Sequence, residues 1–234
     1  MTNPLLKPSA LEYELPPFGS IDDSHYREGF EVGMTEQKAE IATIIALAEP
    51  VTFENTVVAL ERSGATLTRV SNIFFNKSSS DTNDEIDAIE AEFAPLLSAH
   101  EDSIMLNPDL FARISWLFEN RAGLGLDEDD SWLLELYYKD FVHAGAALEA
   151  DKRERLKAIN EELSTLETQF SKNVLADSND LAIVVDDEKE LAGLTKSQIA
   201  SASKAAESWG LPGKWLITMV NFTGHPLLSS LQNR

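Results

Sequence analysis

Four histidines are the residues of this chain whose type best suits metal chemistry: His25, His100, His143 and His225. Zinc hydrolases often hold their metal with a His-Glu-x-x-His motif, because that spacing puts two imidazoles one helical turn apart on the same face. No two of the four histidines have this spacing, and the chain has no cysteine that could supply a thiolate ligand. The sequence therefore predicts no metal ligand and no catalytic residue in this chain, and it leaves the substrate-binding residues unknown.

Each histidine also has a structural interpretation. His100 lies on the apolar stripe of a predicted helix, which favours a buried, hydrogen-bonded core residue, and His143 beside Phe141 is expected to be similar. His25 stands near a helix start. Together with Tyr26 it could contact a ligand, although the structural role is the favoured one.

Other familiar catalytic patterns are absent from the sequence. There is no Gly-x-Ser-x-Gly elbow, no phosphate-binding Walker loop and no Gly-x-Gly-x-x-Gly motif. Carboxylates are so frequent that no pair of them is informative. The acidic run Asp127–Asp130 could bind a cation, but its spacing is not that of an EF-hand loop, so the first turn of a helix is favoured.

Charge is the strongest compositional signal. Lys and Arg total 19 and Asp and Glu total 40, which gives a net charge of −21. Between Asp81 and Glu149 only Arg113, Arg121 and Lys139 are basic. An acidic surface repels phosphate backbones, which argues against nucleic-acid partners. It would attract basic peptides or, as we favour, serve as a solvated face.

The targeting and membrane signals are also absent. No apolar run approaches the roughly 18 residues that a membrane helix needs. The N-terminus lacks the basic start and apolar block of a signal peptide. With no cysteines, the chain suits a reducing compartment. We expect a cytoplasmic protein with no membrane partner.

The elements that would position any site are mostly helices. Four prolines make residues 1–20 an extended arm. Residues 21–180 are expected to form a helical domain of long antiparallel helices. The first begins with Ser20, Asp22 or Asp23 as its cap and ends at Pro50. The later helices are predicted at 53–75, at 84–104 with a kink or join at Pro95, at 107–121 with Asn107 as its cap, at 126–148 and at 151–180.

Residues 181–234 have a different pattern. The short β-branched run 181–185 and the run 214–220 predict two strands, and residues 195–209 between them predict a helix with a Thr195–Gln198 capping box. The segment beginning at His225 is typical of a helix entrance without an end signal, so we expect a truncated helix in a piece of a longer polypeptide. The predicted fold is mainly α: a multi-helix, bundle-like domain with a small two-strand β element.

The apolar stripes suggest how these helices pack. Gly29 and Gly33 predict a close helix contact. The stripe aromatics Phe53, Phe93 and Phe170 are expected in the core. We expect the stripe of 53–75 to pack chiefly against the near-heptad seam Leu156–Phe170.

Several long segments, in order along the chain, resemble the N-terminal part of bacterial peptidyl-dipeptidases, relatives of oligopeptidase A and thimet oligopeptidase. They include HYREGFEVGM, FENTVVALERSG, LTRVSNIFFNKSSSDTND, FVHAGAAL, RLKAINEELSTLETQFSKNV and GKWLITMVN. The resemblance implies a mostly helical zinc metallopeptidase about three times this length. Such enzymes remove C-terminal dipeptides from short peptides or cleave short peptides internally.

In that family, the zinc ligands and the catalytic Glu lie in the later part of the polypeptide, and no position here matches them. The resemblance therefore implies a channel-wall domain that is inactive alone. Its partners would be the missing catalytic domain and, in the whole enzyme, short peptides. Some apolar surface should remain exposed where the catalytic half would pack. The alternative is a stand-alone acidic helical module for protein interaction, without enzymatic activity.

Overall fold

The structure, a computed structural model, describes residues 3–218, 226–227 and 229–233. The chain divides into two compact units, residues 1–168 and 169–234. Three short 3-10 turns come first, at Pro4–Leu6, Glu12–Glu14 and Phe18–Ser20. The helices are α1 (His25–Ala46), a π turn (Glu54–Val58) that runs into α2 (Ala59–Glu61), α3 (Ala65–Ser80), α4 (Asp84–Met105), α5 (Pro108–Asn120), α6 (Glu128–Ala144), α7 (Ala150–Asp180) and α8 (Lys196–Ser208), with 3-10 turns at Arg121–Gly123 and Glu188–Leu191. The strands are β1 (Ile183–Val185) and β2 (Trp215–Ile217).

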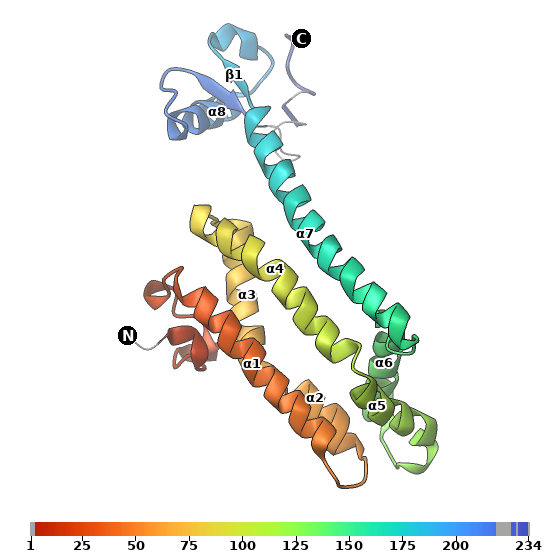
Figure 1. The fold of residues 1–234 in the computed structure, drawn as a ribbon. Coiled ribbons are helices and arrows are strands. Elements are labelled where there is room, and N and C mark those ends of the chain that lie inside the picture. The colour runs from red at the N-terminus through yellow and green to blue at the C-terminus, as the bar shows by residue number, and fades with distance from the viewer. Residues whose placement is uncertain (1–2, 219–225, 228, 234) are drawn as a thin grey trace. The chain divides into compact units, whose positions relative to one another are not determined.

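The closest packing in the first unit joins α1 and α3, which lie against each other in Figure 1. A Cβ atom placed on Gly33 would lie 2.8 Å from the Leu67 Cα, and one placed on Gly29 would lie 3.0 Å from the Val70 Cγ2. At Gly33 only glycine avoids a clash with the Leu67 backbone, whereas at Gly29 a Cβ would press on the Val70 side chain. The prediction of a close helix contact at these two glycines is confirmed.

The predicted helix over 53–75 is wrong as a single element. A π turn and α2 end at Glu61, and α3 begins again at Ala65. Gly64 lies between them with a φ of 73°, a left-handed conformation that glycine adopts at low cost. The Gly64 N–H donates a 2.7 Å hydrogen bond to the Glu40 side chain, so the break is fastened to α1.

The capping predictions have mixed outcomes. Asn107 caps α5 by accepting hydrogen bonds from two backbone N–H groups, and Asp127 caps α6 in the same way with one, as the acidic run predicted. At α1 the cap position is Ser24, which makes no side-chain cap bond, so the three predicted caps are wrong. The helix α4 continues through Pro95 as one element, so a join there is also wrong.

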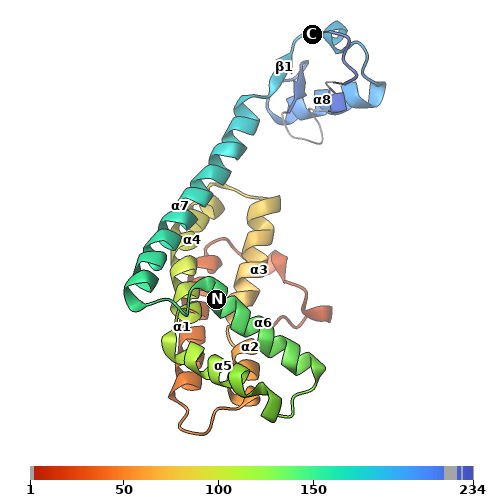
Figure 2. The same cartoon turned by 90° about the vertical axis from the view of Figure 1, so that its right-hand side faces the viewer.

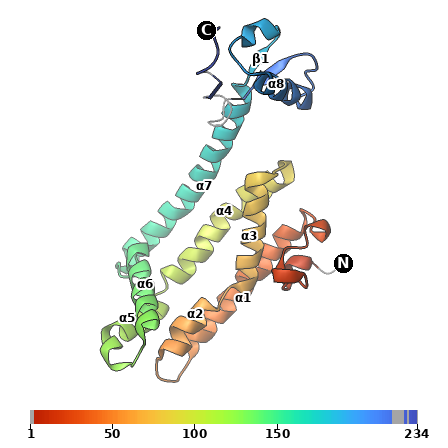
Figure 3. The ribbon, with the colours of Figure 1, turned by 180° about the vertical axis from the view of Figure 1, so that it is seen from behind.

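Two buried clusters form the core of the first unit. One gathers side chains from the C-terminal part of α1, the 54–61 segment, α5 and α6, and Figure 2 shows α5 and α6 at the same end of this unit as α2. The other gathers the arm, α1, α3 and α4 around the rings of Tyr26, Phe30, Phe74 and Phe93. Figure 3 shows α3 beside α1 and α4 from behind. Ring centroids 5.0–5.1 Å apart join Phe30 and Phe74 to their neighbours in that cluster.

The predicted partner of the 53–75 stripe is wrong. Neither buried cluster of the first unit includes a residue of the Leu156–Phe170 seam. Ile159, Leu163 and Leu166 are 36%, 46% and 56% exposed. A hydrogen bond joins this part of α7 to α4: the Asn160 amide donates to the Asp102 carboxylate at 2.8 Å. The stripe of 53–75 packs on α1, α4 and α5.

The second unit contains the predicted β element. β1 and β2 pair antiparallel, with Val184 opposite Leu216, and α8 lies between them in sequence. The Thr195–Gln198 capping box is present at the start of α8. Val185, Leu191 and Ile217 form the buried cluster of this unit. The fold is therefore mainly α with a two-strand sheet, as predicted. His225 and most of the expected helix entrance lie outside the described residues.

Candidate functional site

The described histidines do not meet. His25 accepts a 2.9 Å hydrogen bond from the Asp22 N–H at the start of α1, which is a structural role. His143 is exposed in the last turn of α6, so the prediction that it is a core residue is wrong. Within the described residues, no group of three or more His, Asp or Glu side chains could hold a metal ion. The side chains that the structure describes therefore do not fit a zinc centre.

His100 is buried, as predicted, with 4% of its surface exposed. Its Nε2 lies 2.7 Å from the Gln37 Oε1, which joins α4 to α1. Among the described residues, its Nδ1 has no hydrogen-bond partner. Burial lowers the pKa of His100 below its ordinary value, and the charge of Lys38 lowers it further. The neutral imidazole therefore links α4 to α1 through its hydrogen bond with Gln37.

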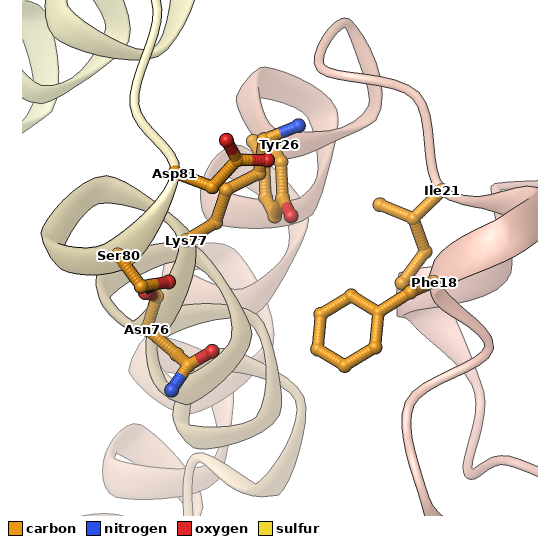
Figure 4. A pocket seen from close by; sticks show the side chains of 7 residues that line it. All are labelled: Phe18, Ile21, Tyr26, Asn76, Lys77, Ser80 and Asp81. Atoms are coloured by element: carbon orange, nitrogen blue, oxygen red, sulfur yellow. Dashed lines mark hydrogen bonds between the residues drawn. The ribbon is translucent and has the colours of Figure 1, made fainter. Parts of the chain in front are cut away.

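A small pocket lies between the arm and the C-terminal end of α3. Its volume is about 320 Å³, and Figure 4 shows its seven lining side chains: Phe18, Ile21, Tyr26, Asn76, Lys77, Ser80 and Asp81. Phe18 of the arm and Ile21 just after it form the apolar wall, α1 supplies Tyr26, and the last turn of α3 together with Asp81 forms the polar wall. Pro16 and Pro17 directly precede Phe18. Because proline disfavours a regular helix, the chain stays irregular up to the position of Phe18 in the pocket.

An ion pair ties the elements around this pocket together. Lys77 donates to the Asp23 carboxylate at 2.5 Å, and the Asn83 amide donates to the other Asp23 oxygen at 2.8 Å. The hydrogen bond to Asp23 raises the pKa of Lys77. Burial raises the pKa of Asp23, but the hydrogen bonds from Lys77 and Asn83 and the Lys77 charge together hold it below its ordinary value. Both groups are therefore charged at neutral pH.

Tyr26 is fully buried, and its hydroxyl has no hydrogen-bond partner within the described part of the chain. Burial raises the pKa of this phenol, so it stays protonated at neutral pH. Of the two residues that the sequence singled out here, Tyr26 lines the pocket, whereas His25 is the first residue of α1 and does not line it. Phe18, Lys77 and Asp81 were missed, because no local spacing shows that the arm returns to the end of α3.

Exposed apolar residues form the second notable surface feature. The seam of α7 exposes Ile159, Leu163 and Leu166, and the arm exposes Tyr13 and Leu15. Phe170 in the second unit is 69% exposed, so its predicted core position is wrong, whereas Phe93 is buried as predicted. Apolar side chains that recur at helical spacing without a partner are typical of surfaces that another protein segment covers. No described helix is both long enough and apolar enough to cross a membrane.

No protein-family model matches this chain. Individual relatives match it along its whole length. It is 40% identical over 232 residues to the dipeptidyl carboxypeptidase of Escherichia coli and 40% identical over 233 residues to that of Salmonella typhimurium. These matches cover 99% and 100% of this chain but 34% of each relative.

The chain also matches, at lower identity, proteins named oligopeptidase A. The chain is 28% identical over 219 residues to oligopeptidase A of Escherichia coli, a match that covers 94% of the chain and 32% of that protein. The chain thus spans about a third of the length of the curated relatives it matches. Over its whole length, the chain is homologous to the dipeptidyl carboxypeptidases and oligopeptidases A, consistent with an N-terminal portion of that family.

Proposed function

We propose that this chain is the N-terminal, channel-wall portion of a cytoplasmic zinc peptidyl-dipeptidase, an enzyme that removes C-terminal dipeptides from short peptides. The observation that carries the proposal is the 40% identity along the whole chain to about a third of a dipeptidyl carboxypeptidase. In this proposal, residues 21–180 form the helical wall, and residues 181–234 form a small segment that leads toward the catalytic part.

The catalytic zinc belongs, in this proposal, to the part of the relatives that this chain does not match. The coverage of the matches supports this placement, since the chain spans only 34% of each dipeptidyl carboxypeptidase. No step of peptide hydrolysis is therefore assigned to a side chain of this chain. Its contribution would be to limit access, because a wall of packed helices admits an extended peptide and excludes a folded one.

The exposed seam of α7 supports a role for this chain as one part of a larger assembly. Ile159, Leu163 and Leu166 follow one another at helical spacing and lie outside both buried clusters of the first unit. We propose that the catalytic part of the same polypeptide covers them. The gain from covering such side chains is about 25 cal/mol for each Å² of apolar surface removed from water.

A chimera tests this proposal. The N-terminal third of the Escherichia coli dipeptidyl carboxypeptidase is replaced by this chain, and the release of dipeptides from a short peptide is followed by mass spectrometry. We expect the chimera to release dipeptides from the C-terminal end of the peptide. The control is the same chimera with the Glu of the catalytic His-Glu-x-x-His motif changed to Gln, which should be inactive.

A second measurement uses the 234-residue chain alone, incubated with the same peptide and added zinc. We expect no dipeptide release. Robust zinc-dependent turnover by the isolated chain would contradict the assignment of catalysis to the absent part. A well-folded chimera without activity would contradict the channel-wall role.

A stand-alone acidic module for protein interaction is the second candidate. The net charge of −21 favours it, because such a surface attracts basic peptides. Binding of a Lys-rich peptide should then weaken strongly as salt is added. Binding that does not depend on salt would argue against an electrostatic origin.

A further inference from the structure

The pocket beside the end of α3 is not used by the proposed function, and it has the features of a binding site. Its volume of about 320 Å³ is at the lower end of the range for small-molecule sites, which is about 300–1,000 Å³. It is lined by the apolar Phe18 and Ile21 on one side and by polar groups of α3 on the other, as Figure 4 shows. A small ligand with one apolar end and one polar end would match this division.

The hydroxyl of Tyr26 is the observation that points to a ligand. In Figure 4 the Tyr26 side chain lies between the end of α3 and the arm, with its hydroxyl directed into the space between them. The residue has 0% exposure, and the hydroxyl has no hydrogen-bond partner among the described residues. A buried hydroxyl without a partner is unfavourable, so a ligand that supplied one would gain from it.

The charges around the pocket indicate which sign of charge a ligand should carry. Lys77 and Asp81 are the charged residues that line the pocket, and the Lys77 ammonium is paired with the Asp23 carboxylate, which lies outside the lining. Asp81 also acts on the Lys77 charge, so two carboxylates face one ammonium here. The C-terminal end of α3, at Ser80, adds a partial negative charge of about half a unit, because the peptide dipoles of the helix align along its axis. The local balance is negative, so a cation is favoured over an anion.

The apolar side of the pocket indicates that part of the ligand should be apolar. Phe18 is 53% exposed, although a large aromatic side chain gains free energy from being covered. It lies on a short 3-10 turn, opposite the last turn of α3. An aromatic or aliphatic group that entered the pocket would cover the ring of Phe18 and the side chain of Ile21.

We propose that this pocket binds a small organic ammonium ion with an apolar body, such as an arylalkylamine. The ammonium group lies toward the Asp81 carboxylate and donates a hydrogen bond to the Tyr26 hydroxyl oxygen. The apolar body lies against Phe18 and Ile21. This site is independent of peptide hydrolysis, and it needs no residue outside the first unit.

The first test compares three probes of similar shape on the 234-residue chain by NMR titration: 2-phenylethylamine, the neutral 2-phenylethanol and the anionic phenylacetate. We expect the amine to bind in the millimolar range, about fivefold more tightly than the alcohol, with shifts at Phe18, Asn76 and Ser80. The acetate should bind more weakly than either. Absence of amine binding, equal binding of amine and alcohol, or shifts spread over the acidic surface would overturn the proposal.

Variants sharpen this test. Asp81→Asn should weaken amine binding about three- to fivefold and leave alcohol binding unchanged, since only the charge is removed. Phe18→Ala should weaken both probes. Both residues are exposed, so these variants should keep the fold. The matched control is Asp151→Asn, which removes another exposed carboxylate, at the start of α7, and should leave the binding of both probes unchanged.

The role of the hydroxyl is tested separately with Tyr26→Phe, which keeps the buried ring. We expect weaker amine binding while thermal unfolding stays cooperative. If Tyr26→Phe or Asp81→Asn bound the amine as tightly as the unaltered chain, the assigned contacts would be wrong. An effect of Asp151→Asn as large as that of Asp81→Asn would show attraction to the general acidic surface instead of this pocket.

Discussion

The apolar face of α3 and the apolar seam of α7 have similar spacing in sequence and opposite positions in the structure. On α3, Val70 and Phe74 have 0% exposure. On α7, Leu163 and Leu166 are 46% and 56% exposed. The comparison teaches that helical spacing predicts which side of a helix is apolar but not which surface covers it.

The physical difference between the two faces lies in their neighbours. α3 meets α1 at Gly29 and Gly33, where the absence of side chains lets the helices come close. α7 meets α4 through polar groups, since Asn160 donates to Asp102 and the Ser98 hydroxyl reaches the Asn160 carbonyl oxygen at 3.5 Å. A face held by polar contacts at its edge leaves its apolar seam free for another segment.

The largest expected effect comes from truncating one residue on each face. Phe74→Ala should lower the free energy of unfolding by about 3–5 kcal/mol, because it removes a buried ring and leaves a cavity. Leu163→Ala should lower it by less than about 1 kcal/mol, since the side chain is already half exposed. Urea unfolding measures both. Equal effects would show that α7 is packed in solution and would break the comparison.

The close approach of α1 and α3 is tested next. Gly33→Ala places a Cβ 2.8 Å from the Leu67 Cα, a backbone atom that cannot rotate away. Overpacking of this kind should cost about 1–3 kcal/mol. The matched control is Gly19→Ala, since a Cβ there would meet nothing within 4 Å. A Gly33→Ala variant as stable as the control would contradict the close contact.

A smaller change in the free energy of unfolding is expected from pH, through His100 and its hydrogen bond with Gln37 between α4 and α1. The pKa of His100 is lowered in the folded chain, so the unfolded chain binds the proton more readily. The stabilisation is complete above the ordinary pKa of about 6.5 and is lost as the pH falls toward the lower, folded value. His100→Gln cannot titrate, so its free energy of unfolding should depend less on pH between about 7.5 and 5.5. Identical pH slopes for the two proteins would contradict a buried neutral histidine.

The smallest effect on this chain should come from a polar residue on the seam. Leu163→Gln should change the free energy of unfolding by no more than about 0.5 kcal/mol, because the seam has no partner within the buried clusters of its unit. In the chimera with the catalytic part, the same change should lower thermal stability. The control is Glu162→Gln at the neighbouring exposed position. A seam variant that behaves like this control in the chimera would leave the proposed interface without support.

Local signals in the sequence predicted much of the secondary structure. Asn107 before Pro108, the acidic run after Asp127 and the Thr195–Gln198 box each satisfy backbone N–H groups within a few residues, so no distant contact is needed to place them. The two short strands were recognisable from their β-branched residues. The Gly64 break was missed because its left-handed turn is fastened by Glu40 of another helix.

The pocket could be predicted only in part. Tyr26 was singled out beside His25, but nothing in the spacing indicated Lys77 or Asp81 as its neighbours. Those residues are more than fifty positions away, and the ion pair of Asp23 with Lys77 brings them together. A contact over such a separation depends on how the helices pack, so a local sequence pattern does not predict it.

By itself, the sequence determined that this protein is mainly helical, strongly acidic and similar along its length to a family of peptidases, since composition, spacing and ordered segments are properties of the chain alone. Only the tertiary structure decided which apolar stripe is buried, which stays exposed, and that an arm without regular helix closes a pocket over Tyr26. The physical reason is that burial depends on which surfaces meet, and that choice rests on small residues such as Gly33 and on polar contacts between distant segments.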